Sequence, residues 1–176
     1  MYEEEIKVPK ARIAILIGKQ GIFKRKLEEL TKTQIYVDTK NNEIILKAED
    51  NINIFNTKPV IKAIARGFNP EIAESLIDED YALEVINIKD FSGDSKKKLI
   101  RLKSRCIGTS GKARKNIEQL TNTHISVYGK TVAIIGKIED VIFAKDAVES
   151  ILRGSPHGKV YRRTQERKSR SIDFIH

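Results

Sequence analysis

A four-residue stretch, GTSG at 108–111, has the composition of a turn that could hold a phosphate group. Glycine at both ends removes the Cβ atoms that would keep a sugar-phosphate backbone away from the main chain. A helix beginning directly after the turn would point its first N–H groups, with their partial positive charge, at the same place. Basic side chains follow at once. The predicted phosphate contacts are Gly108, Thr109, Ser110, Gly111, Lys112, Arg114 and Lys115.

The same pattern occurs earlier in the chain. Residues Ile17–Val37 align with Ile107–Val127 at an offset of 90 without a gap. A repeat of this length exceeds the roughly 20 to 50 residues of solenoid units, and it therefore indicates two copies of one small domain. A paired glycine turn alone is a weak signal, but its recurrence in one context strengthens it. The first copy offers as contacts Gly18, Lys19, Gln20, Gly21, Lys24 and Arg25.

The elements that would position these turns follow from the spacing of apolar residues. Each copy is predicted to run β-α-α-β-β-α, with the glycine turn between its first two helices. We therefore expect an α+β fold in which each copy forms a three-stranded antiparallel sheet backed by three helices. The predicted elements cover 5–8, 10–18, 22–32, 33–38, 43–49 and 51–66, and then 82–88, 97–107, 112–122, 124–129, 131–136 and 141–154.

This division predicts two domains, at 1–69 and 81–154, joined by an acidic linker helix at 70–80. Residues 155–176 form a basic C-terminal tail that has no counterpart after the first copy. The tail could be a disordered arm that orders on RNA, or a helix lying against the second domain. Its last residues, IDFIH, suggest some apolar anchoring.

The positive charge is concentrated in the second half of the chain, which carries 33 basic and 24 acidic residues in total. Residues 1–80 hold 13 basic and 14 acidic side chains, residues 81–152 hold 13 and 8, and residues 153–176 hold 7 and 2. A localised basic surface favours a polyanion through counterion release, although a solvated lysine-rich surface is the alternative. We expect the second domain to dominate any binding of nucleic acid.

A surface that contacts bases is expected between the two helices and the strand that follows them. Aliphatic candidates in the second copy are Ile107, Ile117, Ile125 and Val127, flanked by Arg105, although such residues are more often core. Aromatic residues are few and Trp is absent, which argues against a stacking platform. The predicted ligand is a few unpaired nucleotides of RNA.

Nothing in the sequence indicates catalysis, a metal site or a cofactor. The histidines His124, His157 and His176 have no further ligands at metal-binding spacing, and neither glycine turn matches the nucleotide P-loop. Cys106, the single cysteine, suits a small core position and a reducing compartment such as the cytoplasm. No apolar run approaches the roughly 20 residues that cross a bilayer. We expect a monomer.

With a GxxG turn between the helices of a β-α-α-β-β-α unit, each copy resembles a type I KH domain. The segments GTSGKARKNIEQLTNTHISV and AKDAVESILRGSPHGKVYR, together with the two-domain length, resemble the archaeal two-KH-domain proteins of small-subunit ribosome biogenesis. The ending ILRGSPHGKVY, at Ile151–Tyr161, is the most specific part, because generic KH domains do not share it. The resemblance covers essentially the whole chain.

This resemblance implies binding of single-stranded RNA near the 3′ end of small-subunit rRNA, in rRNA processing and ribosome assembly. It also implies a protein partner, either a processing endonuclease or an initiation factor. Two alternatives remain open: a protein-interaction scaffold with degenerate KH domains, or an accessory factor in RNA degradation or translation. The sequence does not decide whether the first domain binds RNA or protein.

Overall fold

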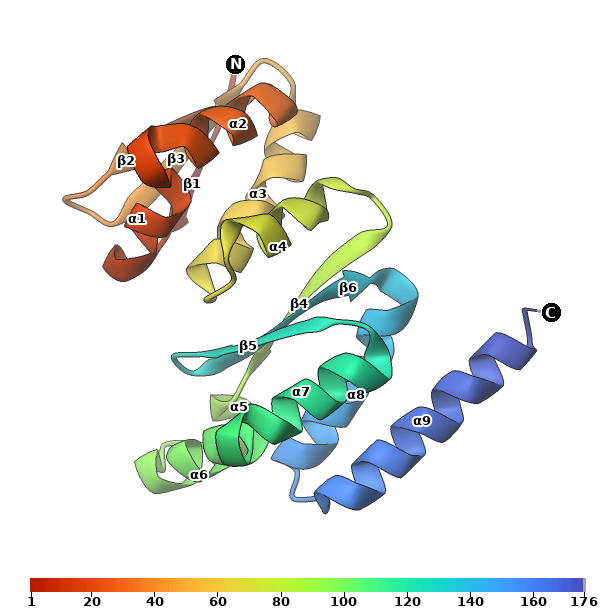
Figure 1. Ribbon diagram of the computed structural model, residues 1–176. Helices are drawn as coiled ribbons and strands as arrows, with labels where there is room; N and C mark the ends of the chain where they lie inside the picture. The colour runs from red at the N-terminus through yellow and green to blue at the C-terminus, as the bar shows by residue number, and fades with distance from the viewer. Residues whose placement is uncertain (176) are drawn as a thin grey trace. The chain divides into compact units, whose positions relative to one another are not determined.

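The computed structural model describes residues 1–175 and divides the chain into two compact units, the first ending at Glu79 and the second beginning at Asp80. Each unit contains a three-stranded antiparallel sheet with helices packed against it (Figure 1). The predicted α+β class and the repeated order β-α-α-β-β-α are confirmed.

In the first unit the strand order is β1-β3-β2, so the last strand along the chain lies in the middle of the sheet. Ile6 of β1 and Val37 of β2 both lie opposite Ile44 of β3, which is fully buried. Alternation along β3 turns Ile44 and Leu46 toward the helices and builds the core. The elements are β1 (Tyr2–Lys7), α1 (Lys10–Ile17), α2 (Ile22–Thr31), β2 (Gln34–Asp38), β3 (Glu43–Ala48) and α3 (Asn51–Ala65).

The segment between the two copies belongs to the first unit. It forms α4 (Pro70–Glu74) and a short 3₁₀ turn, η2 (Ser75–Ile77). Asn69 caps α4 by accepting a hydrogen bond from the N–H of Ile72 at 3.0 Å, and Pro70 occupies the first helical position, where it is tolerated. Ala73 and Leu76 are buried against α3. The acidic segment is therefore a packed helix, and the connection shortens to the residues around Glu79.

The second unit repeats the sheet with the order β4-β6-β5. Ile134 of β6, which lies opposite Ile125 of β5, is fully buried, and Ile86 and Val132 form a second buried pair between β4 and β6. A short helix between β4 and the long helix α6 has no counterpart in the first unit. The elements are β4 (Tyr81–Asn87), α5 (Lys89–Ser92), α6 (Lys96–Ile107), α7 (Lys112–Thr121), β5 (His124–Tyr128), β6 (Thr131–Lys137) and α8 (Ile138–Leu152).

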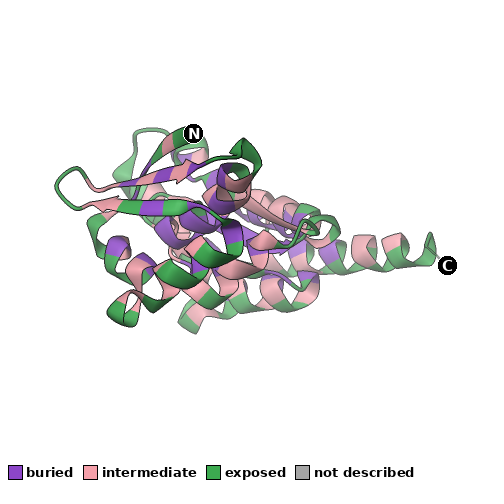
Figure 2. Cartoon of the chain, turned by 90° about the horizontal axis from the view of Figure 1, so that it is seen from above, coloured by how far each residue is buried: buried purple, intermediate pink, exposed green. Residues whose placement is uncertain are grey.

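The basic tail is a helix, α9 (His157–Asp173), which packs against α7 and α8. Val160 and Thr164 are buried in that contact, and Arg167 forms an ion pair with Asp146 of α8 at 2.6 Å. The expected apolar anchoring by the last residues is wrong, because Phe174 and Ile175 are 91% and 81% exposed. Figure 2 shows only half-buried and exposed residues in the last turns of α9. His176 lies outside the described residues.

Candidate nucleic-acid interface

The GTSG turn of the second unit stands between α6 and α7 as a single 3₁₀ turn, η3 (Thr109–Gly111). Thr109 and Ser110 are exposed, and Ser110 adopts a left-handed conformation with φ of 55°. No side chain caps α7, and no acidic residue lies in its first turn. Neither a capping side chain nor an acidic residue of the first turn therefore offsets the partial positive charge at this helix end.

The two glycines of the turn have different physical tasks. A Cβ on Gly108 would lie 2.6 Å from the backbone nitrogen of Ala113, so this glycine allows α7 to cross close to the end of α6. A Cβ on Gly111 would meet nothing closer than 3.8 Å, at the tip of the Arg114 side chain. Both have a φ of +74°. The space over the loop is therefore open at Gly111, while Gly108 serves helix packing.

Among the predicted cations, Lys112 and Lys115 are exposed, whereas Arg114 is half-buried and forms an ion pair. Arg114 Nη1 lies 2.9 Å from Glu118 Oε1, and the same oxygen accepts the N–H of Ile125 at 2.8 Å. Glu118 thus ties α7 to the first residues of β5 and orients Arg114.

The first unit repeats this arrangement with its basic residues at different positions. Lys24 pairs with Glu28 at 3.0 Å, and Glu28 accepts the N–H of Ile35 at 2.8 Å. Its GKQG turn has the same backbone, with Lys19, Gln20 and Arg25 exposed. The differences lie at the start of α2: Ile22, which is 56% exposed, stands where the second unit has Lys112. Phe23 replaces Ala113 and packs over Gly18.

The predicted aliphatic surface is only partly accessible. Ile117 and Ile125 are 1% and 5% exposed and belong to the core, so they can shape a groove only from beneath. Ile107 and Val127 are half-buried. Sequence reasoning missed Ile100 of α6, which is 64% exposed and, with the adjacent Leu99, lines a hollow that extends to Lys130 in the β5–β6 turn. Ile100 and Ile107 lie about two helical turns apart and therefore on the same face of the helix, and this spacing could have identified Ile100 from the sequence.

A second cleft lies beside the turn, between the α6–α7 pair and the beginning of α9. Thr109 and Lys112 line it together with Arg101, which was not predicted, and with His157 and Tyr161 of α9. Tyr161 is partly buried against the core. An aromatic ring therefore does stand beside the loop, and the sequence signal for it was the specific ending SPHGKVY.

Arg105, a predicted contact, has a structural role at the base of this cleft. Its guanidinium donates hydrogen bonds to the backbone oxygens of Ile151 and Ser155 at 2.7 and 2.6 Å. It thereby supplies donors to carbonyl groups at the end of α8 and just beyond it. The Nε2 of His157 lies 2.8 Å from the backbone oxygen of Arg105 and so donates its proton to it. These contacts fix the turn between α8 and α9 against α6.

Cys106 and His124 are the remaining candidate reactive side chains among the described residues. Burial raises the pKa of the Cys106 thiol from 9.0 to about 12, which disfavours the nucleophilic thiolate. Within residues 1–175 no three His, Cys, Asp or Glu side chains are grouped to hold a metal ion. His124 is exposed at the start of β5. The described helices include none with the length and apolarity to span a bilayer.

Comparison with known proteins agrees with this geometry. Residues 82–169 match the model of a eukaryotic type KH domain of type I, and residues 3–66 match a KH domain. A KH domain-containing protein of Methanocaldococcus jannaschii is 43% identical over 162 residues, which cover 90% of this chain and 71% of the relative. The RNA-binding protein pno1 of Dictyostelium discoideum is 31% identical over 96% of this chain and 74% of its own.

Two further relatives carry more specific descriptions. The pre-rRNA-processing protein PNO1 of Saccharomyces cerevisiae is 28% identical over 89% of this chain and 60% of its own length. A solved complex of a/eIF2alpha, aDim2p and rRNA from Pyrococcus horikoshii contains a similar chain, with a TM-score of 0.86 and 42% identity over 96% of this chain and 94% of that one. With both KH domains matched and these identities over most of its length, this chain belongs to the PNO1/Dim2 family of two-KH-domain proteins.

Proposed function

We propose that this chain binds a short unpaired segment of small-subunit rRNA through its second domain. It then acts as a non-catalytic factor in rRNA processing and ribosome assembly in the cytoplasm. The observation that carries the proposal is the exposed turn at 108–111, in front of a helix end that has neither a capping side chain nor an acidic residue. KH domains use this turn to clamp about four nucleotides.

Charge and relatedness support the same assignment. Residues 80–176 hold 20 basic and 11 acidic side chains, against 13 and 13 in residues 1–79. The PNO1 relatives are named for pre-rRNA processing, and a relative with 42% identity has been solved together with rRNA and a/eIF2alpha. A translation initiation factor or a processing endonuclease is accordingly the protein partner that we propose.

Competition between two RNA forms tests the mode of binding. A single-stranded fragment from the 3′ end of small-subunit rRNA should bind at least tenfold more tightly than the same sequence closed in a hairpin, because a duplex cannot present its base edges to the groove. Crosslinking to total RNA followed by sequencing would identify the natural segment. Equal binding of the hairpin, or crosslinks without rRNA enrichment, would contradict the proposal.

A second function, protein docking, is favoured for the first domain by its exposed apolar side chains. Phe55 and Ile52 of α3 are 70% and 53% exposed, and Ile22 beside the glycine turn is 56% exposed. The first domain also has no excess of positive charge. Such a domain can remain in the RNA-bound complex while it contacts a protein partner.

A further inference from the structure

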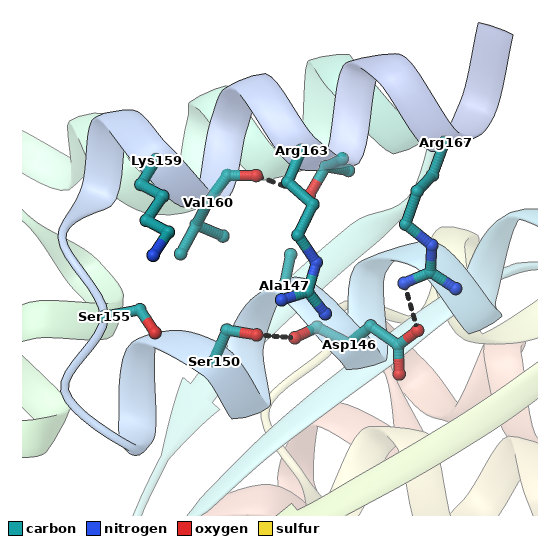
Figure 3. Close-up of a pocket in the computed structure, with 9 residues that line it drawn as sticks. Asp146, Ala147, Ser150, Ser155, Lys159, Val160, Arg163 and Arg167 are labelled. Atoms are coloured by element: carbon teal, nitrogen blue, oxygen red, sulfur yellow. Dashed lines mark hydrogen bonds and ion pairs between the residues drawn. The ribbon is translucent and has the colours of Figure 1, made fainter.

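A hollow of about 70 Å³ lies between α8 and α9, outside the loop and clefts described above. It is open to solvent and is lined by the end of α8, the turn that follows α8 and the first turns of α9 (Figure 3). Its lining is strongly cationic on the α9 side and polar on the α8 side. The residues that matter are Ser150, Ser155, Lys159, Arg163, Arg167 and Asp146.

Two of the cations in the lining are exposed side chains of α9. Lys159 and Arg163 stand one turn apart on α9, and both side chains point toward the hollow in Figure 3. Neither charged group has a hydrogen-bond or ion-pair partner among residues 1–175. Like charges at i and i+4 repel each other weakly on a helix, and an anion bound between them would remove that repulsion.

The one acid in the lining does not neutralise this charge. Asp146 is already paired with Arg167 at 2.6 Å, as the dashed line in Figure 3 shows. The α8 side instead offers the hydroxyl of Ser155, which has no hydrogen-bond partner among the described residues. Ser150 is less available as a donor, because its hydroxyl donates to the backbone oxygen of Asp146 at 2.8 Å.

The backbone adds to the positive potential at the same place. The N-terminus of α9 begins at His157, no side chain caps it, and no acidic residue lies in its first turn. Because Lys159 lies in that first turn, the partial positive charge of the helix end adds to the side-chain cations at the end of the hollow nearest Lys159. Two cations, a free hydroxyl and a helix N-terminus suit a phosphate group better than a carboxylate or a chloride ion.

We propose that this hollow, which we name the α8–α9 phosphate site, binds a backbone phosphate of the RNA strand outside the KH groove. The inference rests on the proposed function, and it extends the interface from the four or so nucleotides at the loop to a flanking phosphate. RNA is favoured as the source of the phosphate because α9 packs on α7, the helix that follows the glycine turn, and because the whole unit is basic.

The test compares two strand lengths and two double variants of the full chain. A strand of about 15 nucleotides can reach both sites, whereas one of about five fills only the KH groove. The double variant Lys159→Gln, Arg163→Gln should bind the long strand about tenfold more weakly, or by about 1.4 kcal/mol. The slope of log affinity against log salt concentration should also become shallower by about 1. Affinity for the short strand should remain within twofold of the unmodified protein.

The matched control pairs Arg162→Gln with Arg170→Gln on the exposed face of α9, which removes the same charge without touching the hollow. It should change long-strand affinity less than twofold. An equal loss in this control, an equal loss with the short strand, or no loss at all would overturn the proposal. If the unmodified protein bound neither strand, the proposed function itself would fail.

Inorganic phosphate provides a readout that needs no RNA. Titrated into the free protein, it should shift the backbone amide resonances of Ser155 and Lys159, and the double variant Lys159→Gln, Arg163→Gln should abolish those shifts. Phosphate binding at this site without any dependence of RNA affinity on strand length would show that the phosphate comes from another molecule, such as a phosphorylated peptide. That result would also overturn the assignment to RNA.

Discussion

At the scale of single residues, Gly108 and Gly111 look equivalent in sequence but should respond differently to substitution. Gly108→Ala would place a Cβ 2.6 Å from the Ala113 backbone nitrogen at a positive φ, so strain and overpacking should together cost about 3 kcal/mol. Gly111→Ala meets only the positive φ and should cost about 1 to 2 kcal/mol. Denaturant unfolding of both variants measures the difference, and equal losses would contradict the assignment of Gly108 to helix packing.

Glu118 is the residue that restrains Arg114. Glu118→Gln keeps an oxygen for the Ile125 N–H but removes the ion pair and a negative charge beside the loop. We expect RNA affinity to rise about two- to fivefold, since Arg114 becomes free for phosphate, while stability falls by less than about 1 kcal/mol. Filter binding and thermal unfolding give the two values.

The companion variant, Arg114→Ala, should lower affinity for all RNA sequences by a similar factor, because phosphate contacts carry no sequence information. Weaker binding by Glu118→Gln would show that the orientation of Arg114 by Glu118 matters more than its release.

At the scale of elements, an arginine in each unit ties the helix before the glycine turn to the end of the helix that follows the sheet, α3 in the first unit and α8 in the second. Arg105 of α6 donates to Ile151 and Ser155, and Arg12 of α1 donates to the backbone oxygens of Ile64 and Phe68 at 2.7 and 2.6 Å. Arg105→Met should cost about 2 to 3 kcal/mol, because two carbonyls lose a charged donor in a partly buried place. RNA affinity of the folded variant should stay within twofold, and a clear loss with full stability would make Arg105 an RNA contact instead.

The sequence predicted the order of elements and placed most of their ends within one to three residues, because apolar spacing and glycine signals are local. It could not show that Arg105 bonds to carbonyls 46 and 50 residues away. It also could not separate core isoleucines from groove isoleucines, since Ile117 and Ile125 follow the same apolar pattern as any accessible position. The four-residue helix α5 is too short to produce a period, and α9 docks through few buried residues, Val160 and Thr164 among them.

At the scale of the whole molecule, two copies of one fold carry different charge and should contribute unequally to RNA binding. The second unit has the basic excess, and Lys112 opens its α7 where the exposed Ile22 opens α2 of the first unit. Thr109→Asp with Ser110→Asp sets two negative charges against the N-terminus of α7. We expect a loss of at least tenfold, or about 1.4 kcal/mol, for the single-stranded rRNA fragment, with the fold intact because both side chains are exposed.

The matched change in the first unit, Lys19→Asp with Gln20→Asp, should cost less than threefold, although it alters the net charge by one unit more than the change in the second unit. Titration of both variants with the same fragment, with circular dichroism as a check on folding, compares the two loops directly. If RNA affinity depended only on the net charge of the protein, the first-unit variant would bind more weakly, since it loses more positive charge. A site in the second unit predicts the reverse order, and equal losses would mean that both KH domains hold the strand.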